Sequence, residues 1–101
     1  MGIQSLKGNI ANEVWASKQT EKLPRDYWRR ARLLLEIINA SRKLENLKVM
    51  GSPPDIRLHK LSGDRKGQWS VTIHMTSGWR LVFRFENGDF YDVEIIDYHG
   101  G

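Results

Sequence analysis

The end of the sequence places three chemically useful side chains in a row. Asp97, Tyr98 and His99 supply a carboxylate, a phenol and an imidazole. Histidine can act as a general acid or base near neutral pH, and tyrosine can stack on a nucleobase or donate a proton. By itself this tripeptide indicates little, because polar residues often end a chain. His59, beside Lys60, is a second candidate, although a lone histidine in a strand is more often packed or solvated than catalytic.

Two arginines suit the recognition of phosphate. Arg80 and Arg84 are four residues apart, which places them on one face of a strand and about 13 Å apart. Each guanidinium offers a planar fork of donors that matches phosphate oxygens. The alternative is that both pair with Asp92 and Glu94 on the neighbouring strand. A phosphate-binding role is favoured for Arg80, and the two interpretations are balanced for Arg84.

Composition excludes several classes of protein. The chain has 101 residues and no cysteine, so it forms no disulfide or thiolate metal site, and we expect one domain over residues 1–101. Its histidines and carboxylates show no metal-ligand spacing such as HExxH. The sequence contains neither a long apolar run nor a signal-peptide pattern, so we expect a cytoplasmic protein without a membrane partner. A net charge of +4 favours a nucleic-acid partner only weakly.

The first half of the chain predicts helices. Residues 3–7 predict a short strand and residues 9–17 a short helix, with Ile10, Val14 and Trp15 turned inward. A longer helix is expected after Pro24, which suits a first helical turn. Its outer face is basic, and such a face is more often solvated than bound to RNA. Apolar residues at three- and four-residue spacing mark its inner face: Tyr27, Ala31, Leu34, Leu35 and Ile38.

The second half changes to the two-residue period of strands. Strands are predicted over residues 57–61, 68–75, 79–86 and 90–98, with Asn87 and Gly88 as a hairpin turn. Alternation in the last strand predicts Tyr91, Val93 and Ile95 on one face. The expected class is α+β, with N-terminal helices packed on one face of a small antiparallel sheet of about four strands. The opposite sheet face is then expected to be concave or flat and exposed to water.

Three ordered segments of the second half resemble a known family. Residues 57–71 read RLHKLSGDRKGQWSV, residues 78–85 read GWRLVFRF, and the final hairpin runs from NGD at 87–89 to VEIIDYH at 93–99. Together they resemble HigB-type toxins of the RelE/ParE toxin–antitoxin superfamily. The resemblance is close from about Leu44 to His99 and extends to the helical part only in layout. Ser62 stands where lysine is common in that family.

The resemblance implies a RelE-like microbial RNase fold and a particular activity. Such a toxin cleaves mRNA on the translating ribosome, with contacts to 16S rRNA expected, and so stops translation. A HigA-type helix-turn-helix antitoxin neutralises it, and the complex binds operator DNA through the antitoxin. No cofactor and no metal are expected, because the 2′-hydroxyl of the RNA attacks the adjacent phosphate. That displacement requires a base, an acid for the leaving oxygen, and positive charge on the phosphate.

The same resemblance implies roles for individual residues. His59 and His99 are the acid–base candidates, and Asp97 orients or ionises one of them. Tyr98 positions the substrate, and Arg80 neutralises the phosphate. Further cations are expected to contact RNA: Lys60, Arg65, Lys66 and Arg84.

Two other functions remain open. A ParE-type toxin of the same superfamily inhibits DNA gyrase and has no RNase site. A non-catalytic module would use the basic surface only to dock RNA or protein. The combination of His59, Arg80, Asp97 and His99 favours RNA cleavage over both.

Overall fold

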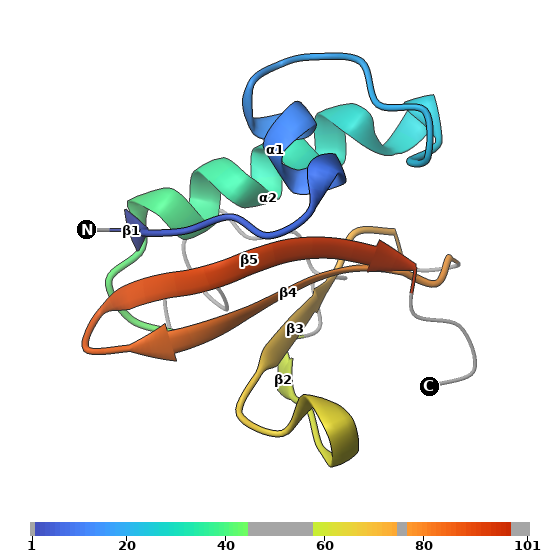
Figure 1. Cartoon of the computed structure of the whole chain (residues 1–101). Helices are drawn as coiled ribbons and strands as arrows, with labels where there is room; N and C mark the ends of the chain where they lie inside the picture. The colour runs from blue at the N-terminus through green and yellow to red at the C-terminus, as the bar shows by residue number, and fades with distance from the viewer. Residues whose placement is uncertain (1, 45–57, 75–76, 98–101) are drawn as a thin grey trace.

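A computed structural model describes residues 2–44, 58–74 and 77–97. Figure 1 shows the helices gathered on one side of a curved sheet. The described elements are, in chain order, β1 (Gly2–Ile3), α1 (Asn9–Trp15), η1 (Arg25–Tyr27), α2 (Trp28–Ala40), β2 (His59–Lys60), η2 (Gly63–Arg65), β3 (Trp69–Thr72), β4 (Trp79–Glu86) and β5 (Asp89–Asp97).

The longer helix, α2, packs on the sheet through the predicted apolar stripe. Pro24 precedes a short 3-10 turn, η1, and the α-helix itself begins at Trp28. Burying a leucine or isoleucine side chain contributes about 1.5–3 kcal/mol, so this stripe is a main source of stability. Neither described helix has the length and apolar character needed to cross a membrane. The inner residues of α2 are each at most 1% exposed: Ala31, Leu34, Leu35 and Ile38.

The shorter helix, α1, ends earlier than the predicted range of 9–17. Its last residue is Trp15, and Ser17 adopts a φ of 60°, which is incompatible with continuing a right-handed helix. Val14 is buried as predicted, whereas Ile10 and Trp15 are only half-buried. The helix therefore provides a short cap for the core.

The sheet has five strands in the order β1-β5-β4-β3-β2. The α+β class is confirmed, but the expectation of a purely antiparallel sheet of about four strands is wrong. β1 pairs in parallel with β5, through Gly2 with Asp89 and Ile3 with Phe90. Parallel neighbours need a long crossover, and the helices together with the other strands supply it. The predicted strand over 79–86 is confirmed residue for residue as β4.

A β-bulge in β5 changes which side chains reach the core. The pairing of β4 with β5 shifts between Val82 and Arg84, and Asp92 on β5 adopts a φ of 50°. As a result Phe90 is fully buried, with its ring 5.1 Å from that of Phe83. The predicted alternation from Tyr91 is wrong at that residue, because one extra residue in the bulge reverses the faces.

The chain segment after β1 holds this bulge in place. The Asp92 amide donates a 2.7 Å hydrogen bond to the Ser5 hydroxyl oxygen, and the Val93 amide donates one of 3.0 Å to the Ser5 carbonyl oxygen. Farther along, the Lys7 amide donates to the Val93 carbonyl oxygen at 2.9 Å. The irregular part of β5 is thus paired on its outer side as well.

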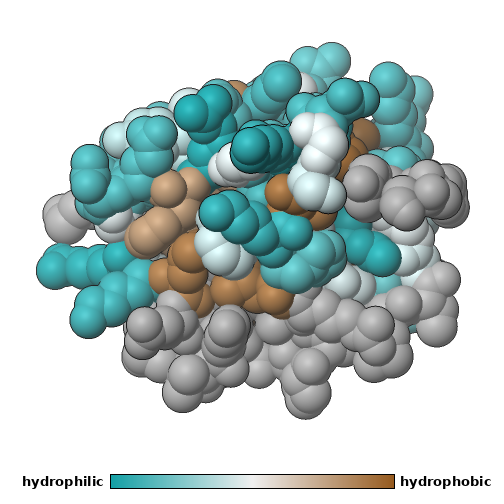
Figure 2. Space-filling model, turned by 90° about the horizontal axis from the view of Figure 1, so that it is seen from below, coloured by the Kyte–Doolittle hydropathy of each residue, from teal (hydrophilic) through white to brown (hydrophobic). Residues whose placement is uncertain are grey.

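The sheet face away from the helices is less exposed than expected. Ser70, Thr72 and Val82 point to that face by strand alternation, yet each is at most 2% exposed. Seen from below, apolar side chains gather in the middle of the molecule with hydrophilic residues around them (Figure 2). The expectation of a face that is wet throughout is therefore wrong for its centre. One covering group is Arg65, whose guanidinium reaches across β4 toward β5.

Removing the Ser5 hydroxyl should destabilise the protein measurably. In Ser5→Ala the half-buried Asp92 amide loses its acceptor, so the free energy of unfolding should fall by about 1–3 kcal/mol in urea denaturation. Ser62→Ala, at an exposed serine, is the matched control and should change stability by no more than about 0.5 kcal/mol. Equal stabilities of the two variants would mean that the hydroxyl does not support the bulge.

Candidate functional site

Strand register brings His59 and Arg80 onto the same face of the sheet. His59 pairs with Ser70 and Ser70 pairs with Val82, and directly paired residues share a face. Arg80 lies two residues from Val82 on β4, so it shares this face as well. His59 and Arg80 are two strands apart across the sheet and two residues apart along it. Ordinary strand spacing and rise then put their Cα atoms about 12 Å apart. We call this face, opposite to the helices, the distal face.

Arg80 keeps its positive charge uncompensated by any described carboxylate. Its guanidinium donates hydrogen bonds to the carbonyl oxygens of Ser77, at 2.8 Å, and Trp79, at 3.1 Å. These neutral acceptors orient the side chain without neutralising it. Within the described residues, the predicted alternative of pairing with Asp92 or Glu94 is not found for Arg80. The side chain is therefore held in place and available to an anion.

Arg84 lies farther along β4 and has an acidic partner on its own strand. Its guanidinium is 3.6 Å from the Glu86 carboxylate, and both side chains are more than half exposed. Such a pair is worth little in water and is easily exchanged for another anion. Arg84 thus borders the distal face without being fixed there.

Arg65 and Glu94 form a bridge that sequence reasoning missed. The Arg65 Nη1 atom is 3.7 Å from Glu94 Oε1 and donates a 3.1 Å hydrogen bond to Gln68 Oε1. Glu94 pairs with Val82 in the register, so the bridge crosses the distal face from η2 to β5. The accumulation of acids near the chain end was the available signal, but it could not say which cation each acid meets.

The other cations predicted to contact RNA are spread over more than one surface. Lys60 pairs with Trp69 and therefore points to the face opposite to His59, with its ammonium 5.8 Å from the centre of the Trp69 ring. Lys66 follows η2 and is exposed. The structure thus does not bring Lys60 together with Arg80.

The final strand carries Asp97 to the end of the sheet. Asp97 is exposed and pairs with Trp79, next to the pair formed by Arg80 and Ile96. It is therefore one residue away from Arg80 in the register, at the end of the sheet, and strand alternation places it on the face of Trp79 rather than on the distal face. Tyr98 and His99, the other two members of the predicted tripeptide, lie outside the described residues.

The third histidine of the chain is placed elsewhere. His74 stacks on Tyr27, with ring centroids 5.0 Å apart and an angle of 26° between the planes. It joins the strand end after β3 to the turn before α2. In the described part of the chain, histidine and carboxylate side chains do not gather in a group of three that could hold a metal ion.

The bridge between Arg65 and Glu94 should couple the two residues energetically. A double-mutant cycle of Arg65→Ala and Glu94→Gln, followed by urea denaturation, should give a coupling energy of up to about 1 kcal/mol. The more exposed pair of Arg84 and Glu86 is the matched control, with an expected coupling near zero. A coupling between Arg65 and Glu94 no larger than that of the control pair would contradict a stabilising role of the bridge.

Comparison with known proteins agrees with the resemblance found in the sequence. Residues 4–99 match the model of a family described as the RelE-like toxin of the type II toxin–antitoxin system HigB. A curated protein, "Endoribonuclease HigB" of Proteus vulgaris, is 49% identical over 43 residues, which are 43% of this chain and 45% of that protein. The match therefore spans less than half the length of that relative. Since the family match covers nearly the whole chain, the prediction is confirmed: the chain belongs to the HigB-like family of RelE-like toxins.

Proposed function

We propose that this chain is a toxin that cleaves mRNA on the ribosome without a metal ion. The observation that carries the proposal is the shared position of His59 and Arg80 on the distal face, with Asp97 one residue away from Arg80 in the register at the sheet end. An acid–base group and a guanidinium that forms no ion pair with a described carboxylate lie on one surface, and such groups are the components that phosphodiester cleavage requires. The relative from Proteus vulgaris, which is called an endoribonuclease, supports the same activity.

In the proposed reaction the RNA supplies its own nucleophile. A base removes the proton of the 2′-hydroxyl, and the 2′-oxygen attacks the adjacent phosphorus. The bond between phosphorus and the 5′-oxygen breaks, and an acid protonates this leaving oxygen, so the products are a 2′,3′-cyclic phosphate and a 5′-hydroxyl end. His59 and His99 are the proposed base and acid, in an order left open. Arg80 stabilises the charge that develops on the phosphoryl oxygens.

The remaining proposed roles concern orientation and RNA contact. Asp97 orients or ionises one histidine, and Tyr98 positions the scissile nucleotide. Phosphates on either side would meet cations near the distal face, and of these Arg65 and Arg84 would exchange a weak acidic partner for RNA. These cations are Arg65, Lys66 and Arg84, while Lys60 would serve RNA that extends beyond this face.

The family also implies a cognate antitoxin, and we propose which type of protein this antitoxin is. A HigA-type helix-turn-helix protein would neutralise the toxin and carry the complex to operator DNA. The proposed targets, mRNA and 16S rRNA, meet on the ribosome, so the proposed site of action is the cytoplasm. The net charge of +4 suits these anionic partners.

Mapping of mRNA ends on programmed ribosomes tests the activity. We expect new 5′ ends within the coding region when the purified protein is added, and loss of cleavage when the mapped nucleotide carries a 2′-deoxy substitution. The substitution removes the nucleophile and leaves base pairing on the ribosome intact. Intact mRNA in cells that nevertheless stop growing would refute the nuclease and favour the gyrase inhibitor.

Substitutions test the proposed residues. Asp97→Ala and His99→Ala should each abolish growth arrest while the protein still folds. Arg80→Ala should lower the cleavage rate constant on the order of 100-fold, as expected when one donor to the transition state is removed. Arg84→Ala is the control, because Arg84 is exposed and peripheral, and should mainly raise KM. Wild-type toxicity of both Asp97→Ala and His99→Ala would refute the assignment of the tripeptide.

A further inference from the structure

The helix layer carries an open hollow that the proposed RNase activity does not use. It lies between the end of α1 and the start of α2 and has a volume of about 210 Å³. All the described residues that line it belong to the segment from Val14 to Arg32, so none comes from the sheet. We call it the helix-layer hollow. The described candidate catalytic residues, His59, Arg80 and Asp97, lie on strands of the sheet.

Two apolar side chains form walls of this hollow. Val14 is 4% exposed and packs in the core, so its position is fixed. The half-buried Trp28 is held by its indole N–H, which donates a 2.8 Å hydrogen bond to the Leu23 carbonyl oxygen. A concave site with rigid apolar walls suits the insertion of an apolar side chain from a partner.

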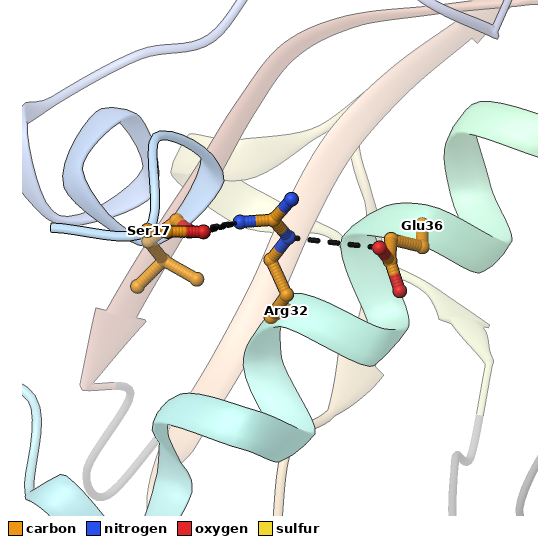
Figure 3. A network of polar contacts seen from close by, with 4 residues as sticks. Ser17, Arg32 and Glu36 are labelled. Carbon is orange, nitrogen blue, oxygen red and sulfur yellow. Dashed lines mark hydrogen bonds and ion pairs between the residues drawn. The ribbon is translucent and has the colours of Figure 1, made fainter.

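One cation of the hollow is already neutralised within the protein. Figure 3 shows the Arg32 guanidinium between the Ser17 hydroxyl, to which it donates a hydrogen bond, and the Glu36 carboxylate at 3.7 Å. It also donates to the Val14 carbonyl oxygen at 3.4 Å and lies 5.3 Å from the centre of the Trp15 ring. Arg32 therefore shapes the hollow and joins α2 to the end of α1.

Two other cations of the hollow remain unbalanced. Lys18 and Arg29 are exposed, and no carboxylate among the described residues forms an ion pair with either. A third positive charge lies nearby, because the Arg25 guanidinium is 5.9 Å from the centre of the Trp28 ring. The hollow thus combines apolar walls with a positive rim, and its natural complement is an apolar side chain flanked by carboxylates.

We propose that the helix-layer hollow binds an acidic segment of the cognate antitoxin. An apolar side chain of that segment packs against Val14 and Trp28, and its carboxylates pair with Lys18 and Arg29. The inference rests on the proposed pairing with an antitoxin, and it adds where that partner docks. A peptide fits the apolar walls of this hollow better than an RNA backbone, whose phosphates need only a basic surface. Docking there would leave the distal face uncovered.

Charge reversal at the rim tests the docking site. Binding of the cognate antitoxin is measured by surface plasmon resonance for the wild type and for the double variant Lys18→Glu/Arg29→Glu. The Kd of the double variant should rise on the order of 100-fold, mainly through slower association, because rim charges steer the encounter of two proteins. Lys7→Glu is the matched control, an exposed lysine that precedes α1 at the opposite end of that helix. Its Kd should remain within about threefold of the wild type.

Two further readouts separate this inference from the proposed RNase activity. The double variant should still cleave mRNA on ribosomes at the wild-type rate, and its thermal unfolding should be unchanged because both residues are exposed. Hydrogen exchange of the wild-type complex should show protection of amides in residues 14–19 and 25–32. These results together would support the docking site.

Three outcomes would overturn the inference. Unchanged antitoxin affinity in the double variant would place the antitoxin elsewhere and leave the RNase proposal untouched. Lost mRNA cleavage with retained antitoxin binding would make the hollow an RNA contact. Absence of any binding between the wild-type toxin and the antitoxin would refute the proposed pairing, and the docking site with it.

Discussion

The β-bulge at Asp92 is the local constraint on which the arrangement of the site depends. Without it, strict alternation in β5 could not bury Phe90 together with Val93 and Ile95 on the helix side. The extra residue in the bulge shifts the alternation by one position, so residues both before and after the bulge point into the core. It also determines that Glu94 points to the distal face and that Asp97, at the sheet end, pairs with Trp79 next to Arg80. Packing and site geometry therefore share one backbone feature.

The bulge in turn relies on the beginning of the chain. Ser5 satisfies the Asp92 and Val93 amides, and β1 pairs in parallel with β5. Backbone donors left unpaired at a half-buried bulge would cost about 1–3 kcal/mol each. The N-terminal segment, which carries none of the candidate catalytic residues, thus contributes to the position of the last strand. The short strand at the sheet edge and the segment after it therefore support the backbone of β5.

Positive charge is distributed over two surfaces with different surroundings. On the distal face, Arg80 is oriented by carbonyl oxygens, while Arg65 and Arg84 have acidic neighbours. On the helix layer, Arg32 is neutralised by Glu36, and Lys18 and Arg29 surround an apolar hollow. The first surface suits a phosphodiester, and the second suits an acidic peptide. Two surfaces of this kind agree with the proposed RNase activity and with a family of toxins from toxin–antitoxin systems.

The sequence by itself determined the α+β class, the inner face of α2, the limits of β4 and the family. Each of these follows from local periodicity or from ordered motifs, which need no knowledge of distant contacts. The sequence also predicted Arg80 and His59 as candidate catalytic residues. Alternation along the predicted strand 79–86 already placed Arg80 on the face opposite to the helices, where the structure has it.

Only the tertiary structure decided the parallel pairing of β1, the bulge at Asp92 and the bridge from Arg65 to Glu94. It also decided that Lys60 points away from His59 and that an open hollow lies between the end of α1 and the start of α2. These features depend on register and on contacts between segments far apart in the chain. A one-residue shift in register moves a side chain to the other face of a sheet, and no local pattern records such a shift.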